Sequence, residues 1–283
     1  MRAEIVAVGS ELLLGDSVDT NSAWLSARLA EIGLDVHRHV TVGDNHTRLV
    51  DALTRAAGRA DAVIVSGGVG PTRDDVTRFA AADVAGVGLA RRDDLVDYLR
   101  QRFAASGRDM PDNNLVQADI PAGGRVLWPV GTAAGFAVDV AGAGRVWCLP
   151  GVPWELRAMA ERDLLPALRA AAGTLTTVSR LVRTAGMGES HVAAAVDDVI
   201  ADLDVAAEAA EAAGDGGQRH SVPTVALLAS GGETRVRVTA RAATRDEALA
   251  RVQPVVDAVV ARLGAGGAGW PSPAPATGSA AGC

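Results

Sequence analysis

Lysine is absent from this 283-residue sequence, cysteine occurs twice, and aromatic residues make up only 3% of it. Cys148 lies in an apolar run and Cys283 is the last residue, which excludes a fold built around several disulfide bonds. Because aromatic rings are so few, the core must be made of Ala, Val and Leu. A hydrophobic share of 48% is still sufficient for a core, so an intrinsically disordered chain is excluded.

Long apolar runs and targeting signals are lacking as well. No apolar run approaches the roughly 18–20 residues that a membrane helix needs. The first apolar segment turns polar at Ser10-Glu11, which makes it too short and too acidic for a secretory signal peptide. The sequence therefore predicts a cytoplasmic protein with no membrane partner.

Positive charge is in short supply, with 27 basic against 34 acidic side chains and a formal net charge of −7. Proteins whose main partner is nucleic acid need clustered positive charge, so this balance argues against such a partner. At roughly 100–200 residues per domain, the length predicts two domains.

Short apolar runs alternate with helical patterns through the first 172 residues. Residues 5–8 and 62–65 are continuous apolar runs that end near glycine, typical of buried parallel strands. Between them we expect a helix that ends at Gly33, a strand over 34–42 and a helix over 46–57. This alternation predicts an α/β fold with a doubly wound, mostly parallel sheet.

Further elements follow in the same region. The pattern predicts helices over 75–84 and 93–106, a buried strand over 145–149, and a helix from Pro153 to about Ala172. In open parallel sheets, ligands bind beyond the carboxyl ends of the strands. The polar segments expected at such ends are Ser10-Glu11, Ser66 to Thr72 and Pro150-Gly151.

The remaining residues predict a smaller α+β domain. We place the domains at 1–173 and 174–263, followed by a disordered tail over 264–283 that is rich in Gly, Ala, Pro and Ser. The second domain is expected to contain a strand over 178–182, a helix over 189–203, a loop or frayed helix end over 206–218, a hairpin of 224–228 and 234–240 around Gly231-Gly232, and a helix over 245–263.

The glycine-rich segment from Ser66 to Thr77 is the most informative part of the chain. Gly67, Gly68 and Gly70 follow a buried strand and let backbone N–H groups approach an anion at the start of a helix. Asp74 and Asp75 suit a divalent cation that bridges them to phosphate oxygens. The alternative is that one of them only caps the helix.

A second polar segment follows the first strand. Capping of the next helix is a sufficient explanation for Asp19, Thr20 or Asn21. Capping does not require Glu11 or Asp16, so a role for them in binding a metal or sugar hydroxyls stays open against a plain surface position.

These segments resemble the competence/damage-inducible protein A (CinA) family, whose first domain is similar to the molybdopterin-binding MoaB/MogA fold. The resemblance rests on GSELLLGDSVDTN and SGGVGPTRDDVTR and extends over roughly residues 1–172. The second region is similar to the family's KH-like domain. The further matching segments are Val42-Gly43-Asp44, Asn114 with Gln117-Ala118, residues 131–136 and 149–155, and, in the second region, residues 183–190 and 223–226.

The resemblance implies hydrolysis of ADP-ribose to AMP and ribose 5-phosphate with a divalent cation, Mg²⁺ or Co²⁺, aided by a monovalent cation. It also implies a homodimer. The family's third domain, a nicotinamide-mononucleotide amidohydrolase, has no counterpart here, so we expect no deamidase activity. Two alternatives remain: a molybdopterin-binding protein without turnover, and a catalytically inactive regulatory protein.

The same resemblance, combined with the charge that develops during pyrophosphate cleavage, suggests residue roles. Asp75, Asp74 and Asp44 are the expected catalytic residues, and Asp75, Asp74 and Glu11 the expected metal ligands. Arg73 could replace the basic residue that many members have at Val116, or be only a surface side chain. The expected substrate-binding residues are Ser10, Asn21, Gly67, Gly68, Gly70, Thr72, Asn114, Gln117, Thr132, Gly135, Pro150, Gly151 and Glu155.

Two weaker signals suggest other ligands. Arg235, Arg237 and Arg241 share one face of a strand, but residues 174–262 contain 9 Arg against 12 Asp and Glu, and the segment Gly186 to Glu189 is not the GxxG clamp of nucleic-acid-binding KH domains. A solvated face is therefore preferred. His37, His39 and His46 are close enough in the sequence to suggest a metal. His37 and His39 share one face of a strand and would need a third ligand from elsewhere, and no Cys or second His cluster offers one, which argues against zinc.

Overall fold

The computed structural model describes residues 1–173, 176–212, 222–230, 233–264 and 268–269. The chain divides into two compact units, Met1–Ala172 and Gly173–Cys283.

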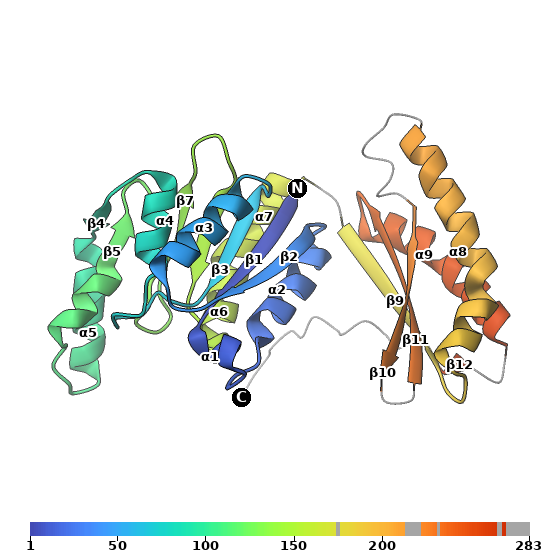
Figure 1. Cartoon of the computed structure of the whole chain (residues 1–283), viewed down its shortest axis with the longest axis horizontal. Coiled ribbons are helices and arrows are strands. Elements are labelled where there is room, and N and C mark those ends of the chain that lie inside the picture. Colours follow the sequence, from blue (N-terminus) through green and yellow to red (C-terminus); the bar gives the residue numbers. More distant parts are fainter. Residues whose placement is uncertain (174–175, 213–221, 231–232, 265–267, 270–283) are drawn as a thin grey trace. The chain divides into compact units, whose positions relative to one another are not determined.

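The first unit contains a six-stranded sheet in the order β2-β1-β3-β8-β7-β6. Figure 1 labels β1, β2, β3 and β7 of this sheet. β2, β1, β3 and β8 are parallel, whereas β7 and β6 are antiparallel additions at one edge. The doubly wound, mostly parallel fold is therefore confirmed. The strands are β1 (Arg2–Val8), β2 (Asp35–Val42), β3 (Ala62–Ser66), β6 (Arg125–Leu127), β7 (Gly135–Asp139) and β8 (Arg145–Leu149), with a separate pair β4 (Leu89–Arg91) and β5 (Asp119–Pro121).

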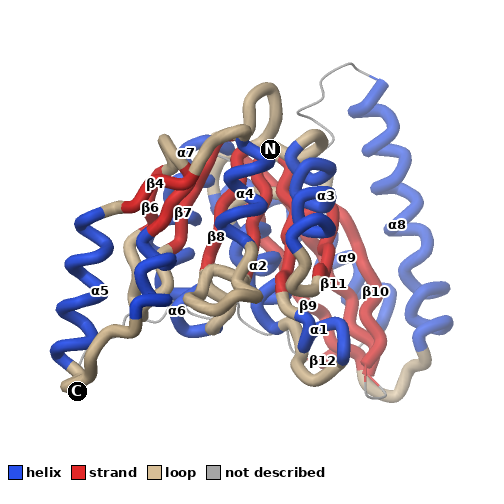
Figure 2. The backbone as a smooth tube through the Cα atoms, turned by 60° about the vertical axis from the view of Figure 1, so that its left-hand side comes forward, coloured by secondary structure: helices blue, strands red, loops and turns tan. Residues whose placement is uncertain are grey.

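Helices cover both faces of this sheet (Figure 2). Strand β3 shows why both faces are apolar: Val63 and Val65 join one core, while Ala62 and Ile64 join the other. The helices are α1 (Ser10–Leu14), α2 (Thr20–Glu31), α3 (His46–Ala57), α4 (Thr77–Ala85), α5 (Asp93–Ala105), α6 (Pro153–Met159) and α7 (Leu165–Ala172), with a 3₁₀ helix η1 (Asp112–Ala118) and a π-helical turn η2 (Ala160–Leu164).

The first unit differs from the sequence-based expectations at the start of α4 and in the strands β4, β5, β6 and β7. Helix α4 begins at Thr77, not at Asp75, because the Asp75 side chain folds back onto the preceding loop instead of entering the helix. The antiparallel strands β6 and β7 were not predicted. β6 has only three residues, too few for a periodic pattern to stand out.

The second unit pairs a sheet in the order β10-β11-β9-β12 with helices α8 and α9. Helix α8 runs on to Ala212, through half of the segment expected as a loop or frayed end. Residues 213–221 and the hairpin turn at Gly231-Gly232 lie outside the described residues. The elements are β9 (Thr176–Thr184), α8 (Glu189–Ala212), β10 (Thr224–Ser230), β11 (Glu233–Ala242), α9 (Arg245–Leu263) and β12 (Ala268–Gly269).

The segment expected to be disordered, 264–283, is described only in part. Ala268–Gly269 pair with β9 as the short strand β12, and Gly264 follows α9. The rest of that segment lies outside the described residues. Among the helices that the structure describes, none is both long and apolar enough to cross a bilayer.

Gly144 is a point at which the first unit has no space for a side chain. A Cβ atom there would lie 2.0 Å from the carbonyl oxygen of Ala60, which is backbone and cannot rotate away. We expect Gly144→Ala to lower the free energy of unfolding by about 2–3 kcal/mol, the cost of forcing an atom into packed structure. Chemical denaturation measures this. Gly88→Ala, where nothing lies within 4 Å, is the matched control and should change stability little. Equal stabilities of the two variants would contradict the prediction.

Candidate functional site

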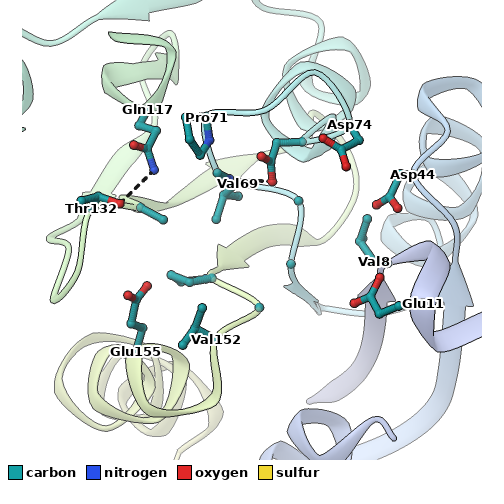
Figure 3. Close-up of a pocket in the computed structure, with 18 residues that line it drawn as sticks. Val8, Glu11, Asp44, Val69, Pro71, Asp74, Gln117, Thr132, Val152 and Glu155 are labelled. Carbon is teal, nitrogen blue, oxygen red and sulfur yellow. Dashed lines mark hydrogen bonds between the residues drawn. The ribbon is translucent and has the colours of Figure 1, made fainter. Parts of the chain in front are cut away.

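A cavity of about 390 Å³ lies at the carboxyl ends of the neighbouring strands β1, β3 and β8 (Figure 3). This is the edge at which the polar segments were expected to meet. The lining comprises Val8, Gly9, Glu11, Asp44, Gly67, Gly68, Val69, Gly70, Pro71, Asp74, Asp75, Gln117, Thr132, Ala133, Pro150, Gly151, Val152 and Glu155.

The loop after β3 can be formed only with glycine at two positions. Gly67 and Gly68 have φ angles of +105° and +67°, which side-chain-bearing residues rarely adopt. A Cβ on Gly67 would lie 2.4 Å from the carbonyl oxygen of Val8, and one on Gly68 would lie 2.3 Å from Oγ1 of Thr77. The loop backbone therefore lies directly against β1 and against the start of α4.

Residues at the start of α4 bind the carbonyl groups of this loop. Thr77 donates from its hydroxyl to the Gly67 carbonyl oxygen (2.8 Å) and from its N–H to that of Gly68 (3.0 Å). In a trans peptide the C=O and the next N–H point in opposite directions. The N–H groups of Gly68 and Val69 therefore face away from α4, and neither has a hydrogen-bond partner among the described residues. Both residues line the cavity, so the loop offers two free donors to an anion.

Arg78 also holds the loop in place through hydrogen bonds. Its guanidinium donates to the carbonyl oxygens of Val69, Gly70 and Val116, and the side chain is only 1% exposed. Burial lowers the pKa of Arg78 to about 10, so the group remains positively charged at neutral pH. No carboxylate of the described chain lies within ion-pair distance of it. A buried cation behind two free N–H donors favours an anionic ligand on the loop.

Asp75 shapes the outer half of the loop. Its Oδ1 accepts from the Gly70 N–H (2.8 Å), and its Oδ2 accepts from the Thr72 N–H (2.8 Å) and from the Thr72 hydroxyl. The Asp75 carboxylate therefore binds the loop backbone. It does not cap helix α4, which was the alternative considered from the sequence. It still lines the cavity, beside the exposed Asp74.

Two further carboxylates lie at the same end of the cavity as Asp74, on the right in Figure 3. Asp44 accepts from the Ser10 N–H (2.8 Å), and the Ser10 hydroxyl accepts from the Asp44 N–H (3.1 Å), which joins the start of α1 to the loop after β2. The Glu11 carboxylate lies over Gly9, where a Cβ would be 2.5 Å from its oxygen. Within the described ranges, however, no three His, Cys, Asp or Glu side chains converge as a group that could hold a metal ion alone.

The opposite end of the cavity has a different chemistry. Gln117 donates from Nε2 to the Thr132 hydroxyl at 3.4 Å, while its Oε1 is buried without a partner. Glu155, in the first turn of α6, is only 9% exposed, and this burial raises its pKa. The carboxylate lies against Gly131, where a Cβ in this arrangement would be 1.9 Å from Oε1 of Glu155.

Five of the expected site residues do not line the cavity. Asn21 is buried and donates to the Ser66 hydroxyl (3.0 Å) and the Gly151 carbonyl oxygen (2.8 Å), so it ties two strand ends together. The other four are Ser10 and Thr72, whose bonds to Asp44 and Asp75 are given above, Asn114, which donates to the Pro111 carbonyl oxygen, and Gly135, which packs against the carbonyl of Cys148 in the sheet.

Sequence reasoning assigned no role to Thr77 or Arg78, and it offered Arg73 as the positive charge of the loop. Arg73 is exposed and does not line the cavity, whereas Arg78 is buried beneath it. The available signal was position: Thr77 and Arg78 are the first two residues of the helix that follows the loop. Side chains there can reach back to loop carbonyls, which lack partners until the fold supplies them.

Comparison with known proteins agrees with this architecture. Residues 4–170 match a family model described as a probable molybdopterin binding domain, and residues 179–266 match one described as the damage-inducible protein CinA KH domain. A "CinA-like protein" of Frankia casuarinae is 44% identical over 94% of this chain, and a "putative competence-damage inducible protein" of Symbiobacterium thermophilum is 40% identical over 93% of it. The chain spans 60% and 59% of the length of these two relatives.

A solved structure is also similar to the chain. The crystal structure of the protein CinA from Thermoplasma acidophilum, described as having unknown function, is 34% identical with a TM-score of 0.53. The similarity covers 57% of this chain and 94% of that one.

Proposed function

Because the chain belongs to the CinA family, we propose that its first unit is a metal-dependent nucleotide-pyrophosphate hydrolase that cleaves ADP-ribose to AMP and ribose 5-phosphate. The observation that carries the proposal is the pair of free N–H donors on Gly68 and Val69, which are backed by the buried Arg78 cation and line a cavity that carboxylates also line. Such an arrangement suits a diphosphate bound together with a cation.

The carboxylates fit a hard divalent cation such as Mg²⁺ or Co²⁺. Mg²⁺ is commonly bound through one or two carboxylates, with substrate phosphates and water completing its shell. Asp74, Asp75 and Glu11 line the cavity and are the residues that would hold it, together with the diphosphate and water, because they do not form a three-ligand group by themselves within the described residues. When bound, the cation would neutralise charge that develops on the leaving phosphate.

Phosphate binding and activation of the attacking water are assigned to residues of the chain. The N–H groups of Gly68 and Val69 would bind phosphate oxygens, and Asp44 would orient or deprotonate the attacking water. The bond from the Ser10 N–H to Oδ2 leaves the other oxygen of Asp44 available for this. Thr72 is not assigned to phosphate, because its hydroxyl is bonded to Asp75.

The test is direct. We expect the purified chain to release AMP from ADP-ribose in the presence of Mg²⁺ or Co²⁺, with AMP measured by chromatography. AMP release should stop when EDTA removes the metal. A panel of divalent metals, with and without K⁺, identifies the preferred cations. No AMP under any of these conditions would overturn the proposal.

A second candidate function is binding of molybdopterin without turnover. It is favoured by the match of residues 4–170 to a probable molybdopterin binding domain. In the same experiment, thermal stabilisation by molybdopterin without any AMP release from ADP-ribose would support this function over hydrolysis.

A further inference from the structure

The sheet of the second unit has two faces of different chemistry. Side chains alternate between the faces along each strand, and the valines of β9 and β11 that face α8 and α9 form one core with both helices. The residues between those valines lie on the opposite face, which we call the open face. Its central residues are Leu181 and Arg183 of β9, Leu228 of β10, and Arg235 and Arg237 of β11.

Three arginines crowd one part of the open face. Arg183 lies directly opposite Arg235 on the neighbouring strand, and Arg237 follows two residues later on the same face. Like charges placed opposite each other destabilise a sheet. Within the described residues, Glu233 lies 3.5 Å from Arg235, but no carboxylate pairs with Arg183 or Arg237. A partner that brings carboxylates would therefore relieve a repulsion that the unit leaves in place.

Arg235 provides a second sign of a missing partner. Its side chain is 34% exposed, yet its Nε is buried and donates to no acceptor among the described residues. A buried donor that lacks an acceptor costs free energy. An acceptor brought to the open face by a partner could remove that cost.

The net charge of the second unit conceals this concentration of arginines. Residues 174–262 contain 9 Arg against 12 Asp and Glu, and this balance favoured a solvated face. In the structure the charges are separated, because β9, β10 and β11 carry five Arg and one Glu. Helix α8, in contrast, carries seven acidic residues and no Arg. The open face is therefore positive although the unit as a whole is negative.

The other side chains of the open face favour a protein over nucleic acid. Leu228 is 38% exposed and lies opposite Arg235, and Leu181 lies opposite Arg237. Bases of single-stranded nucleic acid stack on aromatic rings, but residues 173–269 contain no Phe, Tyr or Trp. Arginine binds carboxylates through paired hydrogen bonds and is enriched in protein interfaces.

We propose that the open face docks an acidic segment of a partner protein. Carboxylates of that segment pair with Arg183, Arg235 and Arg237, and its apolar side chains contact Leu181 and Leu228. The open face of a second copy is no such partner, because it carries the same positive charge. The inference goes beyond the proposed function and does not depend on hydrolysis by the first unit.

Fluorescence anisotropy with the full chain tests the proposal. The probe is a labelled oligo-glutamate peptide that contains leucines, and the reference is a labelled thymidine oligonucleotide of equal net charge. We expect the wild type to bind the peptide more tightly than the oligonucleotide, with an affinity that falls as salt is added. Arg183→Gln combined with Arg237→Gln should weaken peptide binding at least about 5-fold, the scale of two exposed ion pairs.

Two further variants separate the open face from charge in general. Arg245→Gln combined with Arg262→Gln removes the same charge from exposed positions of α9 and is the matched control, which should keep the wild-type affinity. Leu228→Ser leaves the charge unchanged and should weaken binding of the leucine-containing peptide. Circular dichroism should show an unchanged fold in all variants, since the substituted side chains lie at the surface.

The results that would overturn the proposal are distinct. The wild type might fail to bind the peptide even at low salt, which is decisive whether or not any variant folds. Equal binding by the wild type and the Arg183/Arg237 variant, or an equal loss in the α9 control, would show that the open face is not the site. Tighter binding of the oligonucleotide would assign the face to nucleic acid instead.

Discussion

Replacing Asp75 by Asn is expected to reduce ADP-ribose hydrolysis by at least about 100-fold, the scale of losing a preorganised anion site. The carboxylate accepts three hydrogen bonds, from the Gly70 N–H, the Thr72 N–H and the Thr72 hydroxyl. An amide at this position turns an N–H₂ group toward at least one of these donors. The loop would then lose its shape, and the charge available to a cation would fall. The effect should appear mainly in kcat when AMP release is measured under saturating ADP-ribose.

The matched control is Asp97→Asn, which removes one carboxylate from the exposed surface of α5 and should leave hydrolysis unchanged. Circular dichroism of Asp75→Asn should match the wild type, since the residue lies in a surface loop and not in the core. Full activity in Asp75→Asn would contradict both its role in the loop and its role near the cation.

Replacing Arg78 by Met is expected to lower the free energy of unfolding of the first unit by about 3–5 kcal/mol. The guanidinium donates hydrogen bonds to the backbone carbonyl oxygens of Val69, Gly70 and Val116. The thioether of methionine has no hydrogen atom to donate to them. Each buried acceptor left without a partner costs about 1–3 kcal/mol. Chemical denaturation of the wild type and the variant gives the difference.

Arg78→Lys separates charge from geometry, because an ammonium keeps the charge but cannot reproduce the planar set of donors. We expect it to recover only part of the lost stability. Arg73→Met removes the neighbouring exposed arginine and is expected to stay within about 0.5 kcal/mol of the wild type. If the Arg73 and Arg78 variants were equally stable, Arg78 would not support the loop as described.

The positions of the strand ends could be predicted from the sequence, because continuous apolar runs that end at glycine identify buried parallel strands. In such a sheet the segments after Val8, Ser66 and Leu149 meet at one edge, and the cavity is found there. The glycine loop was also predictable, since only glycine tolerates the φ angles that Gly67 and Gly68 adopt. Residues from all three segments line this cavity.

The hydrogen-bond partners of the polar side chains could not be predicted in the same way. Asn21 and Ser10 looked available for a ligand, but the fold engages them with strand ends and with Asp44. Polar groups that become buried take whichever partners the packing brings near, and a linear pattern does not contain that information.

By itself, the sequence determined an α/β fold with a second, smaller domain and the strand edge at which the polar residues collect, because apolar periodicity and glycine positions are local properties of the chain. Only the tertiary structure decided that Arg78, not Arg73, lies beneath the loop, that Asp75 binds the loop, and that Glu155 is buried at the far end of the cavity. These depend on contacts between segments distant in sequence, such as Arg78 with Val116 and Glu155 with Gly131, which form only when the sheet and its helices pack together.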